Sequence, residues 1–83
     1  MFYTYILKSR EKDWFYAGYT EDLKKRFIEH QNGLSPATKP YRPFSLIFYE
    51  AFKSKADAKR REKYFKTNKG KRALYLMLKE SKI

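Results

Sequence analysis

With 83 residues, of which 42% are hydrophobic and 19% aromatic, the chain has the composition of one small folded domain spanning residues 1–83 and is too short for two. Without cysteine it can form neither disulfides nor thiolate metal sites, and without a secretion signal or a membrane-length apolar run we expect a soluble cytoplasmic protein. The formal net charge of +11 favours a polyanionic partner such as nucleic acid.

The N-terminal part of the chain predicts two strands followed by a helix. Residues 2–8 and 14–19 are rich in aromatic and β-branched side chains, and the polar run between them suits a hairpin loop. Apolar side chains occupy both faces of the first strand, which predicts a central strand covered by helices on both sides. Thr20 is the predicted N-cap of the helix, with Glu21 and Asp22 in its first turn.

From Leu23 the apolar spacing becomes that of a helix, which residues 32–33, Asn-Gly, are predicted to end. Arg26 and His30 are spaced i and i+4, so we expect them to be neighbours beside the core-facing stripe. Gly18 ends the second strand, where it would allow a close turn into the helix and leave backbone N–H groups exposed to a phosphate.

The rest of the chain predicts a loop, a third strand and two basic helices. Residues 34–43 contain all three prolines and no periodicity, whereas residues 44–52 alternate as a strand does. Ser54 is the predicted cap of the second helix, and Gly70 is predicted to break the helical run before a last helix over 71–79. The predicted buried stripe of this last helix is Leu74, Met77 and Leu78. The predicted fold is therefore α/β (α+β), a three-stranded, mainly antiparallel sheet flanked by helices in the order β-β-α-β-α-α.

Positive charge is concentrated in the C-terminal part of the chain. Residues 53–83 hold twelve Lys and Arg against three acidic residues, a net charge of +9, and residues 1–52 hold eight against six, a net charge of +2. We expect this region to bind nucleic-acid phosphates; the alternative is a solvated basic face that keeps the protein soluble. Neither C-terminal helix has the wide apolar face that a membrane surface requires.

Basic side chains of the proline-containing loop are predicted to join those of the two basic helices in contacting nucleic acid. In the loop, Thr38 and Tyr41 could also contact a nucleic-acid backbone or stack on a base, or could only pack the loop down. The predicted nucleic-acid contacts are Lys39, Arg42, Lys59, Arg60, Lys63, Lys66, Lys69, Lys71 and Arg72.

Glu62 occupies an inward-facing position on the otherwise basic second helix. A carboxylate there is costly unless it is paired or binds a cation. The residues alone leave two interpretations open, a metal site or a salt bridge with one of three cations. These cations are Lys59, Arg61 and Arg26.

Two tyrosine-containing tripeptides, a helical segment and this glutamate stand in the order of a known family. Tyr3-Thr4-Tyr5 and Tyr16-Ala17-Gly18 match the two signatures, followed by Arg26 to His30 and then Glu62. The chain thus resembles the GIY-YIG nucleases, in particular small single-domain members related to the N-terminal nuclease module of the excinuclease. The signature glycine is Tyr3 here and the signature isoleucine is Ala17. Asn68, which follows Glu62 closely, is the nearest counterpart of the family's asparagine.

This resemblance implies a metal-dependent endonuclease that hydrolyses phosphodiester bonds, in DNA rather than RNA, in DNA repair or recombination. It implies Tyr5 as general base, Tyr16 as the group that orients the water or a phosphate, and Arg26 as the clamp on the transition state. His30 would share the general-base role or hold a phosphate, and Glu62 would bind a divalent ion, Mg²⁺ or Mn²⁺.

These five residues are predicted to converge on one cleft. The sequence does not determine the oligomeric state and is compatible with a monomer. The alternative function is a nucleic-acid-binding module of the same fold with weak or no cleavage, which the altered signatures favour.

Overall fold

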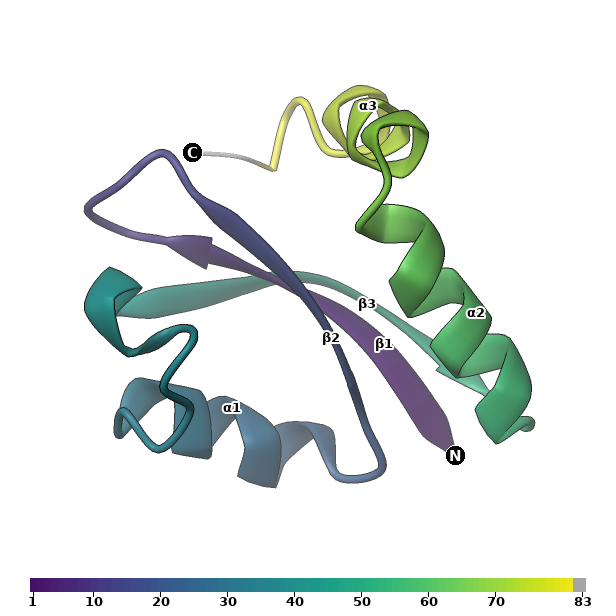
Figure 1. The fold of residues 1–83 in the computed structure, drawn as a ribbon, viewed down its shortest axis with the longest axis horizontal. Helices are drawn as coiled ribbons and strands as arrows, with labels where there is room; N and C mark the ends of the chain where they lie inside the picture. The colour runs from purple at the N-terminus through teal and green to yellow at the C-terminus, as the bar shows by residue number, and fades with distance from the viewer. Residues whose placement is uncertain (82–83) are drawn as a thin grey trace.

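The computed structural model describes residues 1–81 (Figure 1). Over these residues the chain runs in the predicted order β-β-α-β-α-α, with one added 3-10 turn. The elements are β1 (Phe2–Ser9), β2 (Phe15–Thr20), α1 (Leu23–Gln31), η1 (Lys39–Tyr41), β3 (Phe44–Phe52), α2 (Lys55–Phe65) and α3 (Asn68–Met77). None of the helices in this described part is long and apolar enough to span a membrane.

The three strands form one antiparallel sheet in the order β2-β1-β3, so β1 is central as its two apolar faces predict. Tyr5 in β1 stands opposite Gly18 on one side and Tyr49 on the other. A register shift follows between Ile6 and Leu7 in the pairing with β3. The register therefore puts the β1 tyrosine beside the glycine of the edge strand β2.

Each face of the sheet is covered by its own helices, which lie on opposite sides of it in Figure 1. On the α1 face Tyr5, Leu7 and Phe44 form a buried cluster, joined by Leu23 and Phe27 of α1. The cluster on the α2 and α3 face comprises Ile6, Ala17, Phe65, Leu74 and Leu78. Burial of each large apolar side chain contributes about 1.5–3 kcal/mol, so both faces of β1 stabilise the fold.

The start of α1 differs from the prediction, because Asp22 and not Thr20 is the N-cap. Asp22 accepts a hydrogen bond from the backbone N–H of Lys25 at 3.1 Å. Thr20 is still the last residue of β2, and its hydroxyl is bonded to the backbone of Asp22 instead. The first turn consequently contains no acidic residue. At the other end Gly33 has the predicted left-handed conformation, with φ of 76°.

The boundary between the two C-terminal helices also differs from the prediction. Ser54 caps α2 as expected. The helical run is interrupted at Thr67 and not at Gly70, because Thr67 is the N-cap of α3 and its hydroxyl accepts a hydrogen bond from the N–H of Gly70 at 3.0 Å. Gly70 lies inside α3 because a Cβ there would stand 1.8 Å from the carbonyl oxygen of Tyr64, so only glycine allows this approach of α3 to α2.

The buried stripe of α3 follows from the position of Gly70. It runs through Gly70, Leu74 and Leu78, spaced i, i+4 and i+8. Met77 lies beside this stripe and is 46% exposed, so the prediction that it is buried was wrong.

Candidate active site

Tyr5 is held at the centre of the site by the sheet register. Its side chain is 1% exposed and lies across Gly18, where a Cβ would stand 2.3 Å from the Cζ and Oη atoms of Tyr5. The absence of a side chain at Gly18 is therefore what lets the ring cross the edge strand toward α1. There its hydroxyl lies 2.8 Å from Nε2 of His30.

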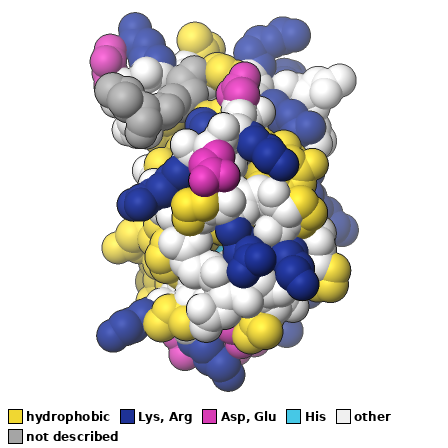
Figure 2. Space-filling view, turned by 90° about the vertical axis from the view of Figure 1, so that its left-hand side faces the viewer, with side chains coloured by type: hydrophobic (Ala, Val, Ile, Leu, Met, Phe, Trp, Pro, Cys, Tyr) yellow, Lys and Arg dark blue, Asp and Glu magenta, His cyan; other side chains and the backbone are white. Residues whose placement is uncertain are grey.

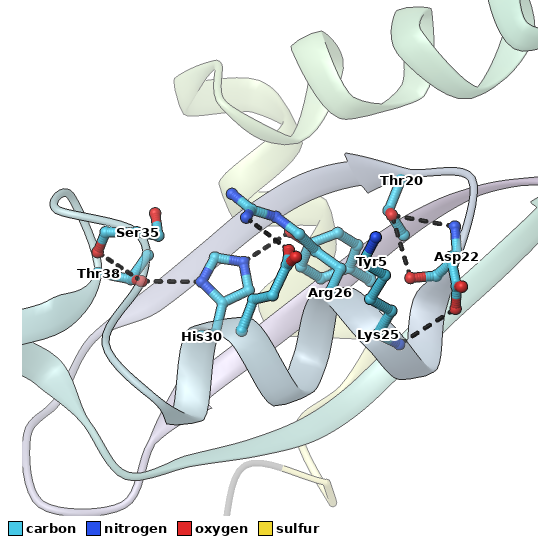
Figure 3. Close-up of polar contacts among 9 residues, drawn as sticks. Tyr5, Thr20, Asp22, Lys25, Arg26, His30, Ser35 and Thr38 are labelled. Atoms are coloured by element: carbon cyan, nitrogen blue, oxygen red, sulfur yellow. Dashed lines mark hydrogen bonds and ion pairs between the residues drawn. The ribbon is translucent and has the colours of Figure 1, made fainter.

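His30 links this tyrosine to the loop that follows α1 (Figure 3). Its ring is fully buried, with Nδ1 2.8 Å from Oγ1 of Thr38, and the Thr38 hydroxyl donates to the carbonyl oxygen of Ser35 at 3.4 Å. A carbonyl can only accept, so the Thr38 oxygen is free to accept from Nδ1–H. Nε2 is then unprotonated and accepts a hydrogen bond from the Tyr5 hydroxyl. The three hydrogen bonds therefore all run in one direction, from Tyr5 through His30 and Thr38 to Ser35.

The protonation of this pair follows from its burial. Burial lowers the pKa of His30 to about 4, with the positive charge of Arg26 acting in the same direction and Glu29 opposing it. Burial likewise raises the pKa of Tyr5 to about 12, although a hydrogen bond from Arg26 opposes the increase. At neutral pH the pair is therefore a neutral phenol that donates to a neutral imidazole.

Arg26 lies one turn before His30 on α1, as its i, i+4 spacing predicts. Its guanidinium donates to Oε1 of Glu29 at 3.1 Å and lies near enough to Tyr5 to lower the pKa of that hydroxyl against the effect of burial. The side chain keeps about a third of its surface exposed, at 32%. A charged, planar donor group thus stands beside Tyr5 with part of its surface open to a ligand.

Tyr16 brings the second signature to the same place. Its ring lies 6.4 Å from the ring of Tyr5 and 5.4 Å from that of His30. On its far side the Nζ atom of Lys66 stands 5.4 Å from the ring centroid. Tyr16 consequently forms the border between the Tyr5–His30 pair and the C-terminal half of the chain.

Glu62 approaches this border from the other face of the sheet. Its helix α2 packs on the face opposite α1, where Thr4 donates to the carbonyl oxygen of Ala58 at 2.6 Å. The Glu62 carboxylate accepts from Lys66 at 3.0 Å, and its negative charge is among the causes that raise the pKa of Tyr5. Because β2 is an edge strand, side chains from both faces can meet around it.

The partner of Glu62 was not among the three predicted cations. Lys66 forms the ion pair because it lies one helical turn further on, at i+4, where it meets the carboxylate without rearrangement. Arg61 instead donates to Glu50 at 2.7 Å. The Glu62 carboxylate retains a side-chain exposure of 21%.

The residues present fit a divalent ion that takes few protein ligands. No group of three or more His, Cys, Asp or Glu side chains that could hold a metal exists among residues 1–81, which excludes a preformed cage there. Mg²⁺ commonly binds through one or two carboxylates and completes its shell with water and substrate phosphates. Glu62, partly exposed and paired with a single lysine, matches this second arrangement.

The predicted nucleic-acid contacts are mostly exposed. Those on α2, on α3 and in the turn between them point to solvent, and Arg42 is half-buried with its Nε donating to the carbonyl oxygen of Lys39. Figure 2 views the end of the molecule that carries η1 and the β1–β2 loop, where Lys and Arg side chains are spread over the whole face with few acidic ones between them. Basic side chains are thus exposed on several elements.

Thr38 and Tyr41 both pack against neighbouring side chains, to different extents. Thr38 is fully buried under His30, and the Tyr41 ring stacks on Trp14 at 3.8 Å between centroids. Gln31 fastens the same loop by bonding the backbone N–H and carbonyl of Phe44, at 2.7 and 3.1 Å. Of the two interpretations of this loop, packing is confirmed for Thr38, whereas Tyr41 packs on Trp14 and stays partly exposed. The sequence offered no periodic signal for the Thr38 contact.

Similarity to known proteins extends along almost the whole chain. A family model for the GIY-YIG catalytic domain matches residues 1–75. The UPF0213 protein YazA of Bacillus subtilis is 43% identical over 74 residues, 87% of this chain and 74% of that protein. The UPF0213 protein SSP2268 of Staphylococcus saprophyticus is 38% identical over 76 residues, 90% of this chain and 92% of that protein. The solution NMR structure of the UPF0213 protein BH0048 from Bacillus halodurans superposes with a TM-score of 0.57 at 33% identity, covering 93% of this chain and 85% of that one.

Proposed function

Because the chain belongs to the GIY-YIG catalytic domain family, we propose that it is a metal-dependent endonuclease that hydrolyses phosphodiester bonds in DNA, in repair or recombination. The observation that carries the proposal is the hydrogen bond of 2.8 Å from Tyr5 to the neutral, buried His30, beside the guanidinium of Arg26. Hydrolysis requires an activated water, stabilisation of charge on phosphorus and a means to release the 3′ oxygen. The chain offers a group for each requirement.

Tyr5 is the proposed contact of the attacking water, with His30 as the final proton acceptor. A pKa of about 12 makes a free phenolate rare at neutral pH, so Tyr5 must lose its proton to a neighbour in the same step. As the water oxygen forms its bond to phosphorus, one water proton moves to the Tyr5 oxygen. The Tyr5 proton moves to Nε2 of His30 while the bond from phosphorus to the 3′ oxygen breaks.

An anionic substrate makes this transfer easier than the resting protein suggests. The pKa of His30 is about 4 in the free protein, where burial and Arg26 both disfavour its cation. A phosphate bound beside Tyr5 opposes the charge of Arg26 and favours an imidazolium, so the pKa of His30 rises when substrate is present. Thr38 keeps Nδ1–H occupied and so reserves Nε2 for the incoming proton.

Arg26 is the proposed clamp on the non-bridging phosphate oxygens. Its planar, permanently charged fork suits two oxygens at once, and the charge that develops on phosphorus strengthens this contact in the transition state. The same group lowers the pKa of Tyr5 against the effect of burial. Tyr16 would orient the water or a phosphate from the opposite side.

Glu62 is the proposed ligand of Mg²⁺ or Mn²⁺, through a carboxylate oxygen that Lys66 bonds in the free protein. When bound, the ion would supply Lewis-acid stabilisation of the departing 3′ oxygen. Lys66, released from Glu62, would be free to contact a substrate phosphate. The exchange keeps the local charge balanced and couples metal binding to DNA binding.

The proposal is tested by incubating supercoiled, nicked and branched DNA with the protein and Mg²⁺, with and without EDTA. We expect cleavage that EDTA abolishes and that Glu62→Gln reduces at least a hundredfold while DNA binding is retained. Glu11→Gln is the matched control, because Glu11 is an exposed carboxylate in the β1–β2 loop, and it should cleave as the parent does. Equal cleavage by the two variants would contradict the role of Glu62.

A binding module without cleavage is the second candidate function. The Glu62–Lys66 ion pair favours it, because this pair neutralises the carboxylate without a metal, and so do Tyr3 and Ala17 in place of the signature glycine and isoleucine. Binding of all three DNA forms with no cleavage in Mg²⁺ or Mn²⁺ would establish it.

A further inference from the structure

A groove of about 350 Å³ opens between β2 and α3, on the face of the sheet opposite α1. Its floor is apolar, and its walls are aromatic side chains of β2, of the β1–β2 loop and of α3. Lys66 and Lys71 stand among the lining residues, with Asp13 as the single acidic one among those described. The aromatic lining residues include Trp14, Phe15, Tyr16 and Tyr75.

This groove shares two lining residues with the border of the candidate active site. Tyr16 and Lys66 line the groove, and the same two residues connect the Tyr5–His30 pair to Glu62. A strand whose phosphate lies between Arg26 and Glu62 would therefore have its neighbouring nucleotide at the mouth of the groove. Lys66 links Glu62 to the groove, because its Nζ atom bonds the Glu62 carboxylate at 3.0 Å and stands 5.4 Å from the centroid of the Tyr16 ring.

The side chains that line the groove favour one class of ligand over others. Aromatic walls over an apolar floor suit a flat ring, and lysines at the same groove suit a phosphate attached to it. The volume lies within the range of about 300–1,000 Å³ that is usual for small-molecule sites. An apolar peptide or lipid tail would offer no counter-charge to Lys71, or to Lys66 once a metal ion takes its place on Glu62. A base inside a duplex is stacked and paired on all sides, so only an unpaired or flipped base could enter.

We propose that this groove binds an unpaired base of the nucleic acid next to the cleaved phosphate. The proposal deepens the proposed function, on which it rests, because it specifies substrates that present a single-stranded or flipped nucleotide at that place. Tyr75, whose ring meets Phe15 at 5.9 Å, would form one wall of the base site. Lys71 would contact the phosphate of the bound nucleotide.

The test uses Trp14, the only tryptophan of the chain and a wall of the groove, as a fluorescent reporter. The full chain is titrated in EDTA, where no cleavage occurs, with single-stranded oligothymidylate, an abasic oligonucleotide of the same length and a blunt duplex. We expect oligothymidylate to quench Trp14 and to bind at least tenfold more tightly than the abasic strand, since stacking on aromatic side chains is lost without bases. The duplex should bind without quenching. Equal affinity for the two single strands would overturn the proposal.

Two variants locate the binding. Tyr75→Ala should lower the affinity for oligothymidylate about tenfold and leave the abasic strand unaffected, whereas Leu76→Ala, a neighbour that is 73% exposed and does not line the groove, should change neither. Circular dichroism of both variants checks that they fold. If Tyr75→Ala binds both strands as the parent does, the base lies elsewhere and the groove proposal fails.

The two proposals fail separately. Loss of quenching with cleavage of DNA intact would remove the groove and leave the nuclease. Quenching with no cleavage in any metal would keep the groove and favour the binding module.

Discussion

Replacing Gly18 by alanine is predicted to disable the site while leaving most of the fold intact. The added Cβ would stand 2.3 Å from the Cζ and Oη atoms of Tyr5, whereas ordinary contacts begin at 3.4 Å. The ring must therefore retreat by about 1 Å. Because Tyr5 is 1% exposed, and Leu7 and Phe44 complete its cluster, this movement has no free space to use.

The consequence for His30 can be estimated from the same geometry. The bond from Tyr5 to Nε2 measures 2.8 Å, so a movement of about 1 Å carries it past the limit of about 3.5 Å for a hydrogen bond. We expect Gly18→Ala to lose about 1–3 kcal/mol of stability through overpacking. Single-turnover cleavage should fall about a hundredfold, the usual scale for a misplacement of 1 Å.

The assay compares urea unfolding with single-turnover cleavage at a temperature where the variant is folded. Gly70→Ala is the control, because its Cβ would meet the carbonyl of Tyr64 between α2 and α3, away from Tyr5. It should reduce stability more than Gly18→Ala and change the cleavage rate per folded molecule less. Cleavage by folded Gly18→Ala within a few-fold of the parent would refute the requirement for the Tyr5–His30 contact.

Three further outcomes are expected. Thr38→Val should remove the acceptor of Nδ1–H and slow cleavage at least tenfold, whereas Thr38→Ser should retain the rate. ¹⁵N NMR of the single histidine should show the altered tautomer of His30 in Thr38→Val. An unchanged tautomer would contradict the series of hydrogen bonds from Tyr5 to Ser35. The pKa of His30 is about 4 in the folded protein and 6.5 in the unfolded chain, so the unfolded state binds more protons between these pH values. The free energy of unfolding should therefore fall by up to about 3 kcal/mol as the pH drops from 6.5 to 4. His30→Gln should abolish this part of the pH dependence. If residues 53–72 carry binding and neutralise about six phosphates, DNA affinity should fall about 10³-fold between roughly 50 and 200 mM salt, and a salt-insensitive affinity would exclude the basic helices as the binding surface.

Local patterns were enough to predict most of the fold. The alternation of residues 44–52 reproduces β3, and Ser54 and Gly33 act at the helix ends where their side chain and backbone preferences place them. The two errors at helix ends arose where tertiary contacts override such preferences. Thr20 is kept in β2 by its pairing with Tyr3, and Gly70 is inside α3 because the helix crosses the backbone of α2.

The candidate site was predictable where strand register or helical spacing determines it. Arg26 and His30 share an edge of α1 because of their i, i+4 spacing, and Tyr5 meets them through the hairpin register. Thr38 lies in an aperiodic loop that is fastened by Gln31 and Trp14, and no local pattern announces such contacts. Burial, which sets the protonation of Tyr5 and His30, is likewise a property of the folded molecule alone.

In the proposed mechanism Tyr5 and His30 act as one unit on the attacking water. A double-mutant cycle measures this directly, with single-turnover cleavage rates of Tyr5→Phe, His30→Gln and the double variant under saturating DNA and Mg²⁺. Each single change should cost about a hundredfold or more, and the double variant should be no slower than the slower single variant, as for other residues that act together. Losses that add, or a Tyr5→Phe variant as fast as the parent, would contradict the shared role.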